Sequence, residues 1–271
     1  MSRKKIDFNS ENPNKDFWSS KLIYKVEKTE RLDYEYLVHQ TNIKSKRILD
    51  TACGNGDFLD FANDAIRFGI DFSEIQVRAA KSRNNGLYCV ADVKNIPFKN
   101  NVFDVVFSSH LIEHLYEHEL IQYFKNAFFT LKQNGKFVCH TCPNTLYRYG
   151  VYRFYTRWVR MVLYRIANLF LTKKMAVPSL RDFTPESKVS KLHVNEKSPY
   201  SLRNSLKNAG FTNLKVWCYG EPFKFKFLML PIYIVELLYP LPKIFPTFFT
   251  NHVWAVAEKN GTCESIQTNI L

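Results

Sequence analysis

The chain has 271 residues, of which 46% are hydrophobic and 23% are charged. This size and composition are typical of one folded domain with an embellishment, and they exclude a disordered or low-complexity chain. The formal net charge of +13 favours an anionic partner such as a membrane surface, a nucleic acid or an acidic substrate.

Targeting and redox features favour an intracellular protein. The basic start of the chain is not followed by the apolar stretch of a secretory signal. The six cysteines lack the spacing of a disulfide framework, so we expect free thiols in a reducing compartment. The most apolar run, 227–241, contains Glu236 and is interrupted by prolines, and it is shorter than the ~20 residues that span a bilayer. We therefore predict a cytoplasmic protein without a spanning helix.

In chain order, strand-like and helix-like patterns alternate. Residues 1–45 are expected to form a helical leader. Short apolar runs predict strands at 47–53, 66–71, 87–92, 102–109, 136–142, 214–219 and 253–258. Helical patterns lie at 58–65, 73–83, 111–132 and 198–209, with Ser73 expected to cap the second helix and the third expected to stop near Gly135.

This alternation predicts an α/β fold. We expect a Rossmann-like, doubly wound, mostly parallel seven-stranded sheet with helices on both faces, and ligands beyond the carboxyl ends of the strands. Residues 1–271 are expected to form a single domain. Two segments fall outside the alternation: a basic aromatic insertion after strand five at 146–192, expected to be helical, and an apolar insertion before the last strand at 221–251.

A glycine loop follows the first predicted strand. Its residues, 50–56, read DTACGNG, which is too poor in glycine and wrongly spaced for a GxGxxG dinucleotide loop. The loop resembles motif I of class I S-adenosylmethionine-dependent methyltransferases, with alanine at the first glycine position. That resemblance implies that the cofactor S-adenosyl-L-methionine contacts Asp50, Ala52, Gly54 and Gly56. Alanine is expected to be tolerated if its φ is negative; a glycine turn kept for packing alone is the alternative.

Acidic residues end the next two predicted strands. Asp71, followed by Phe72, stands about twenty residues after the glycine loop, where adenosine-binding Rossmann folds place the acid that binds the ribose. The alternative is a charge that favours a helix N-terminus. Residues 92–107, from Asp92-Val93 through IPF to FDVVF, resemble type 11 methyltransferases. The resemblance covers 48–144 well, returns at 198–211, and implies that Asp92 and Val93 contact the adenine.

The fourth predicted strand ends in SSHLIEHL, residues 108–115. In type 11 enzymes this segment lies beside the transferred methyl, which adds Ser108 and His110 to the expected cofactor site. The same letters spell an inverted zinc-protease signature, an interpretation disfavoured by the strand-four context. Some similar ubiquinone-pathway O-methyltransferases bind a divalent cation here, with an acid at the position of His110. Because a histidine weakens the case for Mg²⁺, we expect no metal.

Nearby residues supply candidates for proton transfer. His114 is the first candidate for a general base and His193, before the helical pattern at 198–209, is the second. Histidines that only fix a loop or the substrate by hydrogen bonds are the alternative. Cys139 and Cys142 form a CxxC motif, but strand alternation points them to opposite faces, so a shared ligand is not expected.

The insertion 146–192 holds ten Lys or Arg against two acids. As a helix it would carry a broad apolar face, with Arg153, Arg157 and Arg160 opposite. The apolar residues are Val151, Phe154, Tyr155, Trp158, Val162, Ile166 and Leu169. Such a helix can lie on an anionic membrane surface. A lid over the active site, in which the two insertions pack on each other, is the alternative; nucleic acid is a less favoured partner.

These features together predict an S-adenosylmethionine-dependent methyltransferase acting on a small or lipophilic acceptor by O-methylation, placed in the cytoplasm or peripherally on the membrane. Catalysis would come mainly from alignment of donor and acceptor. Methylation of a surface sugar or another small metabolite is the first alternative. A noncatalytic cofactor-binding, membrane-docking protein and a dinucleotide oxidoreductase are the others, the last disfavoured by the missing GxGxxG loop.

Overall fold

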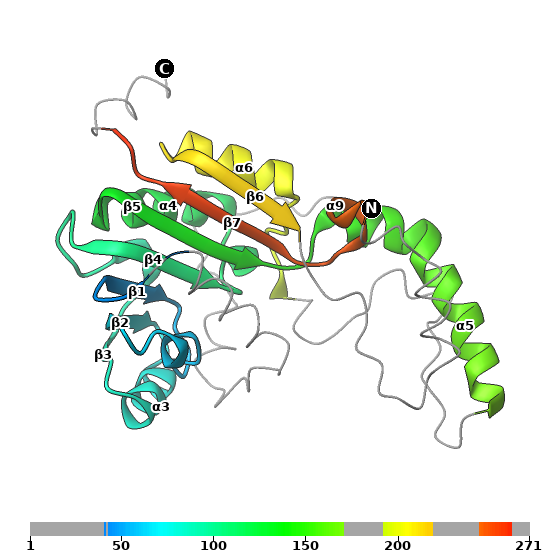
Figure 1. Ribbon diagram of the computed structural model, residues 1–271, viewed down its shortest axis with the longest axis horizontal. Helices are drawn as coiled ribbons and strands as arrows, with labels where there is room; N and C mark the ends of the chain where they lie inside the picture. The colour runs from blue at the N-terminus through cyan, green and yellow to red at the C-terminus, as the bar shows by residue number, and fades with distance from the viewer. Residues whose placement is uncertain (1–40, 42, 171–191, 219–243, 262–271) are drawn as a thin grey trace.

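A computed structural model describes residues 41, 43–170, 192–218 and 244–261. Its centre is a seven-stranded sheet with the order β3-β2-β1-β4-β5-β7-β6 (Figure 1). The strands are β1 (Arg47–Thr51), β2 (Ile66–Asp71), β3 (Leu87–Val90), β4 (Phe103–Ser109), β5 (Leu131–Thr141), β6 (Thr212–Cys218) and β7 (Val253–Glu258). The first five strands pair in parallel, whereas β7 is antiparallel to both of its neighbours. The predicted mostly parallel sheet is confirmed.

Helices cover both faces of this sheet. Alternate strand side chains point to opposite faces, so Leu49 and Ile48 enter different clusters of the core. On the first face, α4 (Glu117–Thr130) and α6 (Pro199–Asn208) bury their apolar sides. On the second, α3 (Glu74–Arg83) packs with the short 3₁₀ turn η1 (Phe58–Phe61). This arrangement is the doubly wound fold that the sequence predicts.

The predicted helix at 111–132 is divided and ends earlier than expected. A 3₁₀ turn, η3 (Ile112–His114), precedes α4, and α4 stops at Thr130 because Leu131 already begins β5. The end of α4 is held from a distant part of the chain: the buried Lys259 ammonium donates to the Leu131 carbonyl at 2.8 Å. A cation at a helix C-terminus is favourable, and no local sequence signal announces this one.

Two other local predictions were wrong. The helix expected at 58–65 is the single turn η1, in which the ring of Phe58 stacks on Phe107 with centroids 3.5 Å apart before the chain turns into β2. Ser73 is the N-cap residue of α3, but its hydroxyl makes no capping bond. The carboxylate of Asp71 instead accepts from the Ser73 backbone N–H at 2.8 Å. The leader expected within 1–45 lies almost wholly outside the described residues.

Part of the first insertion extends away from the sheet (Figure 1). It consists of η4 (Leu146–Thr156), wound as a π-helix, and α5 (Arg157–Phe170). The short helix α9 (Pro246–Phe249) packs on η4, with the rings of Tyr155 and Phe249 edge to face. No helix among the described residues is both long enough and apolar enough to cross a membrane. The five cysteines in the described part of the chain are free thiols, as expected.

Candidate active site

The carboxyl ends of the five parallel strands lie at one edge of the sheet, and the predicted site residues follow them. Thr51 of β1 pairs with Ile70 of β2 and with Ser108 of β4. Ser109 of β4 pairs with His140 of β5. Residues that are far apart in the sequence therefore meet at this edge, where doubly wound folds bind ligands.

The glycine loop after β1 is built from left-handed backbone. Ala52, Gly54 and Gly56 have φ angles of 60°, 51° and 81°. A Cβ at Gly54 would meet no atom within 4 Å, whereas a Cβ at Gly56 would lie 2.8 Å from the Tyr88 hydroxyl. Gly54 thus leaves open space where a ligand can approach the backbone, and Gly56 permits close packing on β3. The condition under which alanine was expected to be tolerated, a negative φ, is not met, because the turn places Ala52 in the left-handed region.

Replacing Ala52 by glycine is therefore expected to stabilise the fold by about 0.5–1 kcal/mol. The left-handed conformation costs an L-residue about 1–2 kcal/mol, which the extra chain entropy of glycine partly offsets. Urea unfolding of Ala52→Gly measures the difference. Ala62→Gly is the matched control: Ala62 is buried with φ −98°, so its replacement should destabilise the protein. A loss of stability in Ala52→Gly would contradict the strain argument.

Two buried carboxylates lie where β1 and β2 end. Asp50 is 3% exposed and Asp71 is 7% exposed. Asp71 accepts the backbone N–H of Gly54 at 2.9 Å as well as that of Ser73, so it ties the glycine loop to the start of α3. Burial, followed by the charges of Asp71 and Asp57, raises the pKa of Asp50 well above its ordinary value. Burial also raises the pKa of Asp71. This pair would be stabilised by a cationic ligand.

The end of β3 supplies the expected adenine-side residues. Phe72 is half-buried beside Asp71, and Val93 is buried in the core at the start of η2 (Val93–Asn95). The half-buried Asp92 caps η2 by accepting from the backbone N–H of Lys94 at 3.0 Å. Asp92 therefore stabilises the start of η2, at the same edge of the sheet as the two buried carboxylates.

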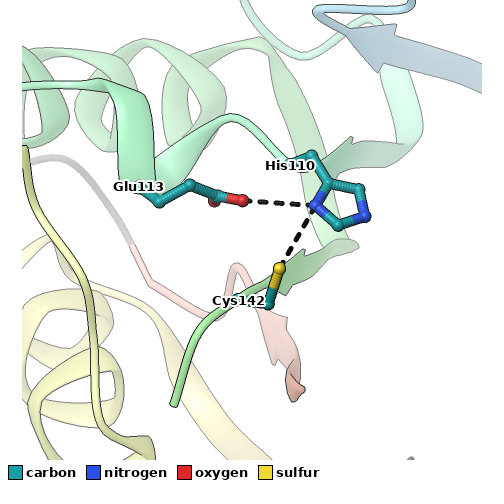
Figure 2. Close-up of side chains that lie close together, drawn as sticks. All are labelled: His110, Glu113 and Cys142. Carbon is teal, nitrogen blue, oxygen red and sulfur yellow. Dashed lines mark hydrogen bonds and ion pairs between the residues drawn. The ribbon is translucent and has the colours of Figure 1, made fainter. Parts of the chain in front are cut away.

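The segment after β4 gathers a buried acid and a histidine. Ser108 is fully buried, and His110 has a left-handed φ of 53°. The Nδ1 of His110 lies 3.2 Å from Glu113 Oε1 and 3.6 Å from Cys142 Sγ (Figure 2). Burial alone would raise the pKa of Glu113, but the hydrogen bond and charge of His110 outweigh it, and the pKa falls to about 2. The fold therefore holds an ionised carboxylate in its interior.

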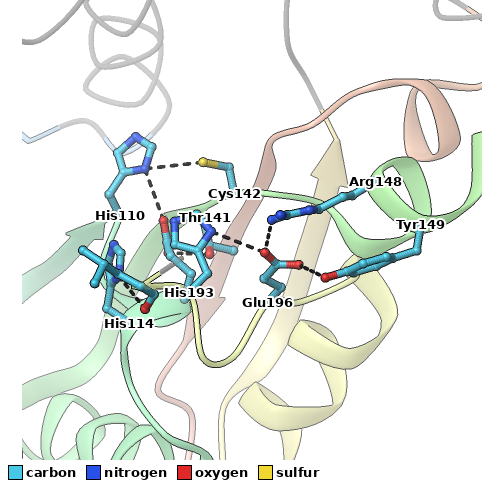
Figure 3. Close-up of polar contacts among 10 residues, drawn as sticks. His110, His114, Thr141, Cys142, Arg148, Tyr149, His193 and Glu196 are labelled. Atoms are coloured by element: carbon cyan, nitrogen blue, oxygen red, sulfur yellow. Dashed lines mark hydrogen bonds and ion pairs between the residues drawn. The ribbon is translucent and has the colours of Figure 1, made fainter. Parts of the chain in front are cut away.

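The two predicted base candidates lie next to each other. The rings of His114 and His193 have centroids 5.0 Å apart, at an angle of 67° (Figure 3). The strand-four segment also fixes the chain before α6, because Val194 N–H and Asn195 N–H both donate to the Glu113 carbonyl. His193 Nδ1 lies 3.4 Å from a carboxylate oxygen of Glu196. Tertiary structure thus brings together residues about eighty positions apart.

Comparison with known proteins identifies a domain that contains part of this candidate site. The sequence model of the family described as "Methyltransferase domain" matches residues 49–139. This stretch contains the glycine loop, both buried carboxylates and the segment after β4. The chain carries an S-adenosylmethionine-dependent methyltransferase domain.

Relatives of this methyltransferase include two curated enzymes. The demethylmenaquinone methyltransferase of Staphylococcus saprophyticus is 24% identical over 66% of this chain and 76% of that enzyme. The phthiotriol/phenolphthiotriol dimycocerosates methyltransferase of Mycobacterium leprae is 32% identical over 31% of this chain and 34% of its own length. Phosphoethanolamine N-methyltransferase 2 of Haemonchus contortus, solved with S-adenosyl-L-methionine, is 17% identical, covers 85% of this chain and 53% of its own, and has a TM-score of 0.55. The S-adenosyl-L-methionine bound by that neighbour is consistent with the cofactor that the sequence motifs predict for this chain.

Sequence reasoning missed several polar residues of the methyltransferase site. Glu196 forms a salt bridge with Arg148 and accepts from the Tyr149 hydroxyl at 2.9 Å (Figure 3). Cys142 was considered only as the partner of Cys139, which lies in the core. The parallel pairing of β4 with β5 is the signal that could have placed Cys142 beside His110, because neighbouring parallel strands end at the same edge.

Proposed function

We propose that this methyltransferase transfers the methyl group of S-adenosyl-L-methionine to a hydroxyl oxygen of a small lipophilic acceptor, reached from a membrane surface. In this proposal residues 1–271 form a single domain and 146–192 is the insertion on the acceptor side. The cofactor lies along Asp50, Ala52, Gly54, Gly56, Asp71, Phe72, Asp92, Val93, Ser108 and His110. The observation that carries the acceptor class is a set of exposed apolar side chains on η4 and α5, the insertion that follows β5.

The charge at the glycine loop supports this placement of the cofactor. S-adenosyl-L-methionine carries a sulfonium and an ammonium, and the buried carboxylates of Asp50 and Asp71 repel each other without such a cation. The open space over Gly54 admits the ligand to the backbone. Asp71 can accept hydrogen bonds from ribose hydroxyls through lone pairs that the backbone N–H groups of Gly54 and Ser73 leave available.

The histidine pair supplies the proposed proton acceptor. His114 and His193 lie beyond the end of β4, the segment that lies next to the transferred methyl in type 11 enzymes. The displacement at the sulfonium methyl needs alignment of donor and acceptor, and a nearby imidazole takes the hydroxyl proton as the new C–O bond forms. The Glu196 carboxylate positions His193 within the pair.

The exposed apolar residues lie on η4 and α5. Phe154 is 72% exposed, Trp158 46%, Val162 51% and Leu169 77%. At this helical spacing they share one face with the exposed Arg165, whereas Arg153, also exposed, lies on η4 towards the opposite side. Arg157 was expected opposite this face, with Arg153 and Arg160, but it is buried at 4% exposure with its guanidinium 5.5 Å from the Trp158 ring. The side chains of Arg160 and Ile166 are outside the described set.

This face is connected to the histidine pair through η4. Arg148, in the first turn of η4, binds Glu196, which in turn lies against His193 (Figure 3). An amphipathic helix with exposed aromatics and arginines lies in a bilayer interface. An acceptor dissolved in the lipid would then be close to the site. Two relatives, named for demethylmenaquinone and for phthiotriol dimycocerosates, support a lipophilic acceptor.

Methyl-labelled cofactor tests the acceptor class. The purified chain, incubated with labelled S-adenosyl-L-methionine and a cell extract, is expected to place the label in material that partitions into organic solvent. Asp71→Asn serves as the variant with weakened cofactor binding. Label confined to the water-soluble fraction would instead favour a sugar or another polar metabolite. Cofactor binding measured by calorimetry, without transfer to either fraction, would favour a noncatalytic binding protein.

Binding to anionic vesicles is expected to depend on the exposed side chains of η4 and α5. Arginines near a charged bilayer contribute about 1 kcal/mol each, so the double variant Arg153→Gln/Arg165→Gln should bind about 30-fold more weakly to vesicles containing phosphatidylglycerol. Trp158→Ser should weaken binding to neutral and anionic vesicles alike, because it removes inserted apolar surface. Sedimentation with vesicles measures both effects.

The matched control is Arg78→Gln, because the Arg78 side chain is 76% exposed on α3. It changes the net charge without touching η4 or α5. Equal sedimentation of the double variant and the unmodified chain would rule out this docking face.

A further inference from the structure

Three potential metal ligands converge at the carboxyl ends of β4 and β5. The Nδ1 of His110 is 3.2 Å from Glu113 Oε1 and 3.6 Å from Cys142 Sγ (Figure 2). One ligand atom from each of the three residues lies within 4.8 Å of the other two. We propose that His110, Glu113 and Cys142 bind a divalent transition metal ion, with zinc(II) the best match.

The spacing of the three atoms suits a tetrahedral ion. Zinc bonds to nitrogen and oxygen are about 2.0–2.2 Å and those to sulfur about 2.3 Å, so ligand atoms of a tetrahedral site are separated by about 3.3–3.8 Å. The His110 to Glu113 and His110 to Cys142 distances match those edges closely. The ligand atoms of Glu113 and Cys142, the third pair, lie within 4.8 Å of each other.

The surrounding structure holds the ligands in place. The Thr141 hydroxyl donates to Glu113 Oε2 at 2.6 Å, leaving Oε1 towards His110. The backbone N–H of His110 donates to the His140 carbonyl at 3.1 Å, and His110 keeps a left-handed φ at this point. Outer hydrogen bonds of this kind orient metal ligands, and unfavourable backbone conformations gather at functional sites.

The combination of an imidazole, a carboxylate and a thiolate as ligands determines which metal ion the site would favour. Magnesium prefers oxygen ligands, whereas a thiolate and an imidazole favour zinc and its neighbours among the transition metals. Three protein ligands leave a fourth position, as in catalytic zinc sites. In terms of the proposed function, that position would take a water or the acceptor hydroxyl, whose proton the metal makes easier to remove. This role rests on the proposed function; metal binding itself does not.

A second group, Glu113, His114 and His193, shares the same carboxylate. It lacks a thiolate, and the experiment must distinguish the two. The full chain, stripped with a chelator, is titrated with cobalt(II), which reports thiolate ligation through a charge-transfer absorption band. We expect one cobalt per chain, a thiolate band, and displacement of cobalt by zinc.

Cys142→Ser is expected to abolish the band and to weaken metal binding by at least about 100-fold, since even outer partners of a ligand cost about 10–100-fold. His110→Ala should also weaken binding. Cys89→Ser is the matched control, because Cys89 is a half-buried free thiol on β3, in a different part of the sheet. It should leave cobalt binding and its band unchanged.

Three results would overturn the metal site: no stoichiometric cobalt binding, a thiolate band that survives in Cys142→Ser, or binding lost in His193→Ala but kept in His110→Ala. Circular dichroism and calorimetry with S-adenosyl-L-methionine show whether Cys142→Ser remains folded. Cobalt binding by the wild type is readable even if methyl transfer to a lipophilic acceptor is never found, so failure of the proposed function and failure of the metal site give different results.

Discussion

The variant Asp71→Asn is expected to bind S-adenosyl-L-methionine about 10–150-fold more weakly than the unmodified chain, a loss of about 1.5–3 kcal/mol. Each oxygen of the Asp71 carboxylate accepts a backbone N–H, from Gly54 at 2.9 Å and from Ser73 at 2.8 Å. An asparagine offers one oxygen and one NH₂ group, so one of these N–H groups would face another donor. The substitution removes the charged acceptor for the ribose and also loosens the glycine loop.

Asp104→Asn is the matched control for this effect. Its carboxylate also accepts a backbone N–H, from Arg47 at 2.9 Å, and it pairs with Lys132, but it lies at the beginning of β4, at the opposite end of the strand from the site. Both variants lose hydrogen bonds to a carboxylate, and both should be less stable. Only Asp71→Asn should lose cofactor affinity in calorimetry. Wild-type affinity in Asp71→Asn would remove Asp71 from the cofactor site.

Replacing Asp50 by asparagine is expected to change stability and cofactor affinity in opposite directions. Its carboxylate is buried and is repelled by Asp71 and Asp57, so removing the charge should stabilise the fold at a pH where the carboxyl is ionised. The same change removes negative charge from the region proposed to hold the sulfonium and ammonium groups. We expect cofactor binding to weaken by at least about tenfold, or about 1.4 kcal/mol.

The raised pKa of Asp50 also predicts how the stability gain of Asp50→Asn depends on pH. Because the folded-state pKa is raised, the protonated carboxyl is compatible with folding, and the stability penalty of Asp50 grows as pH rises from its ordinary pKa through the folded value. The gain in Asp50→Asn should therefore be small in acid and should grow with pH until the folded-state pKa is passed. For Asp104 burial alone would raise the pKa, but the hydrogen bonds from Lys132 and Arg47 lower it. The stability of Asp104→Asn relative to the unmodified chain should accordingly fall as pH rises, because the variant lacks the stabilising charge of the ionised Asp104. Urea unfolding across this range measures both, and a stability gain independent of pH would contradict the charge argument.

Local sequence was sufficient for the strands and for the mostly parallel, doubly wound class of the sheet. The apolar strand β4 and the alternation of strands with helices come from residues within one element, so periodicity alone reveals them. The type 11 resemblance also lies within a continuous stretch, and the match to residues 49–139 agrees with it. Element ends were less well predicted: α4 ends where β5 begins, and the carbonyl there is bound by Lys259, which lies far along the chain.

The sequence by itself determined the fold class, the cofactor and the methyltransferase domain, because the glycine loop and the acids after β2 and β3 are local patterns with a regular spacing. Only the tertiary structure decided that Ala52 is left-handed, that Arg157 is buried, and that Cys142 lies beside His110. Each of these depends on which segments pack together. Ala52 lies in a turn constrained at both ends, Arg157 is on a helix whose rotation is set by its neighbours, and Cys142 and His110 follow two parallel strands that end at one edge.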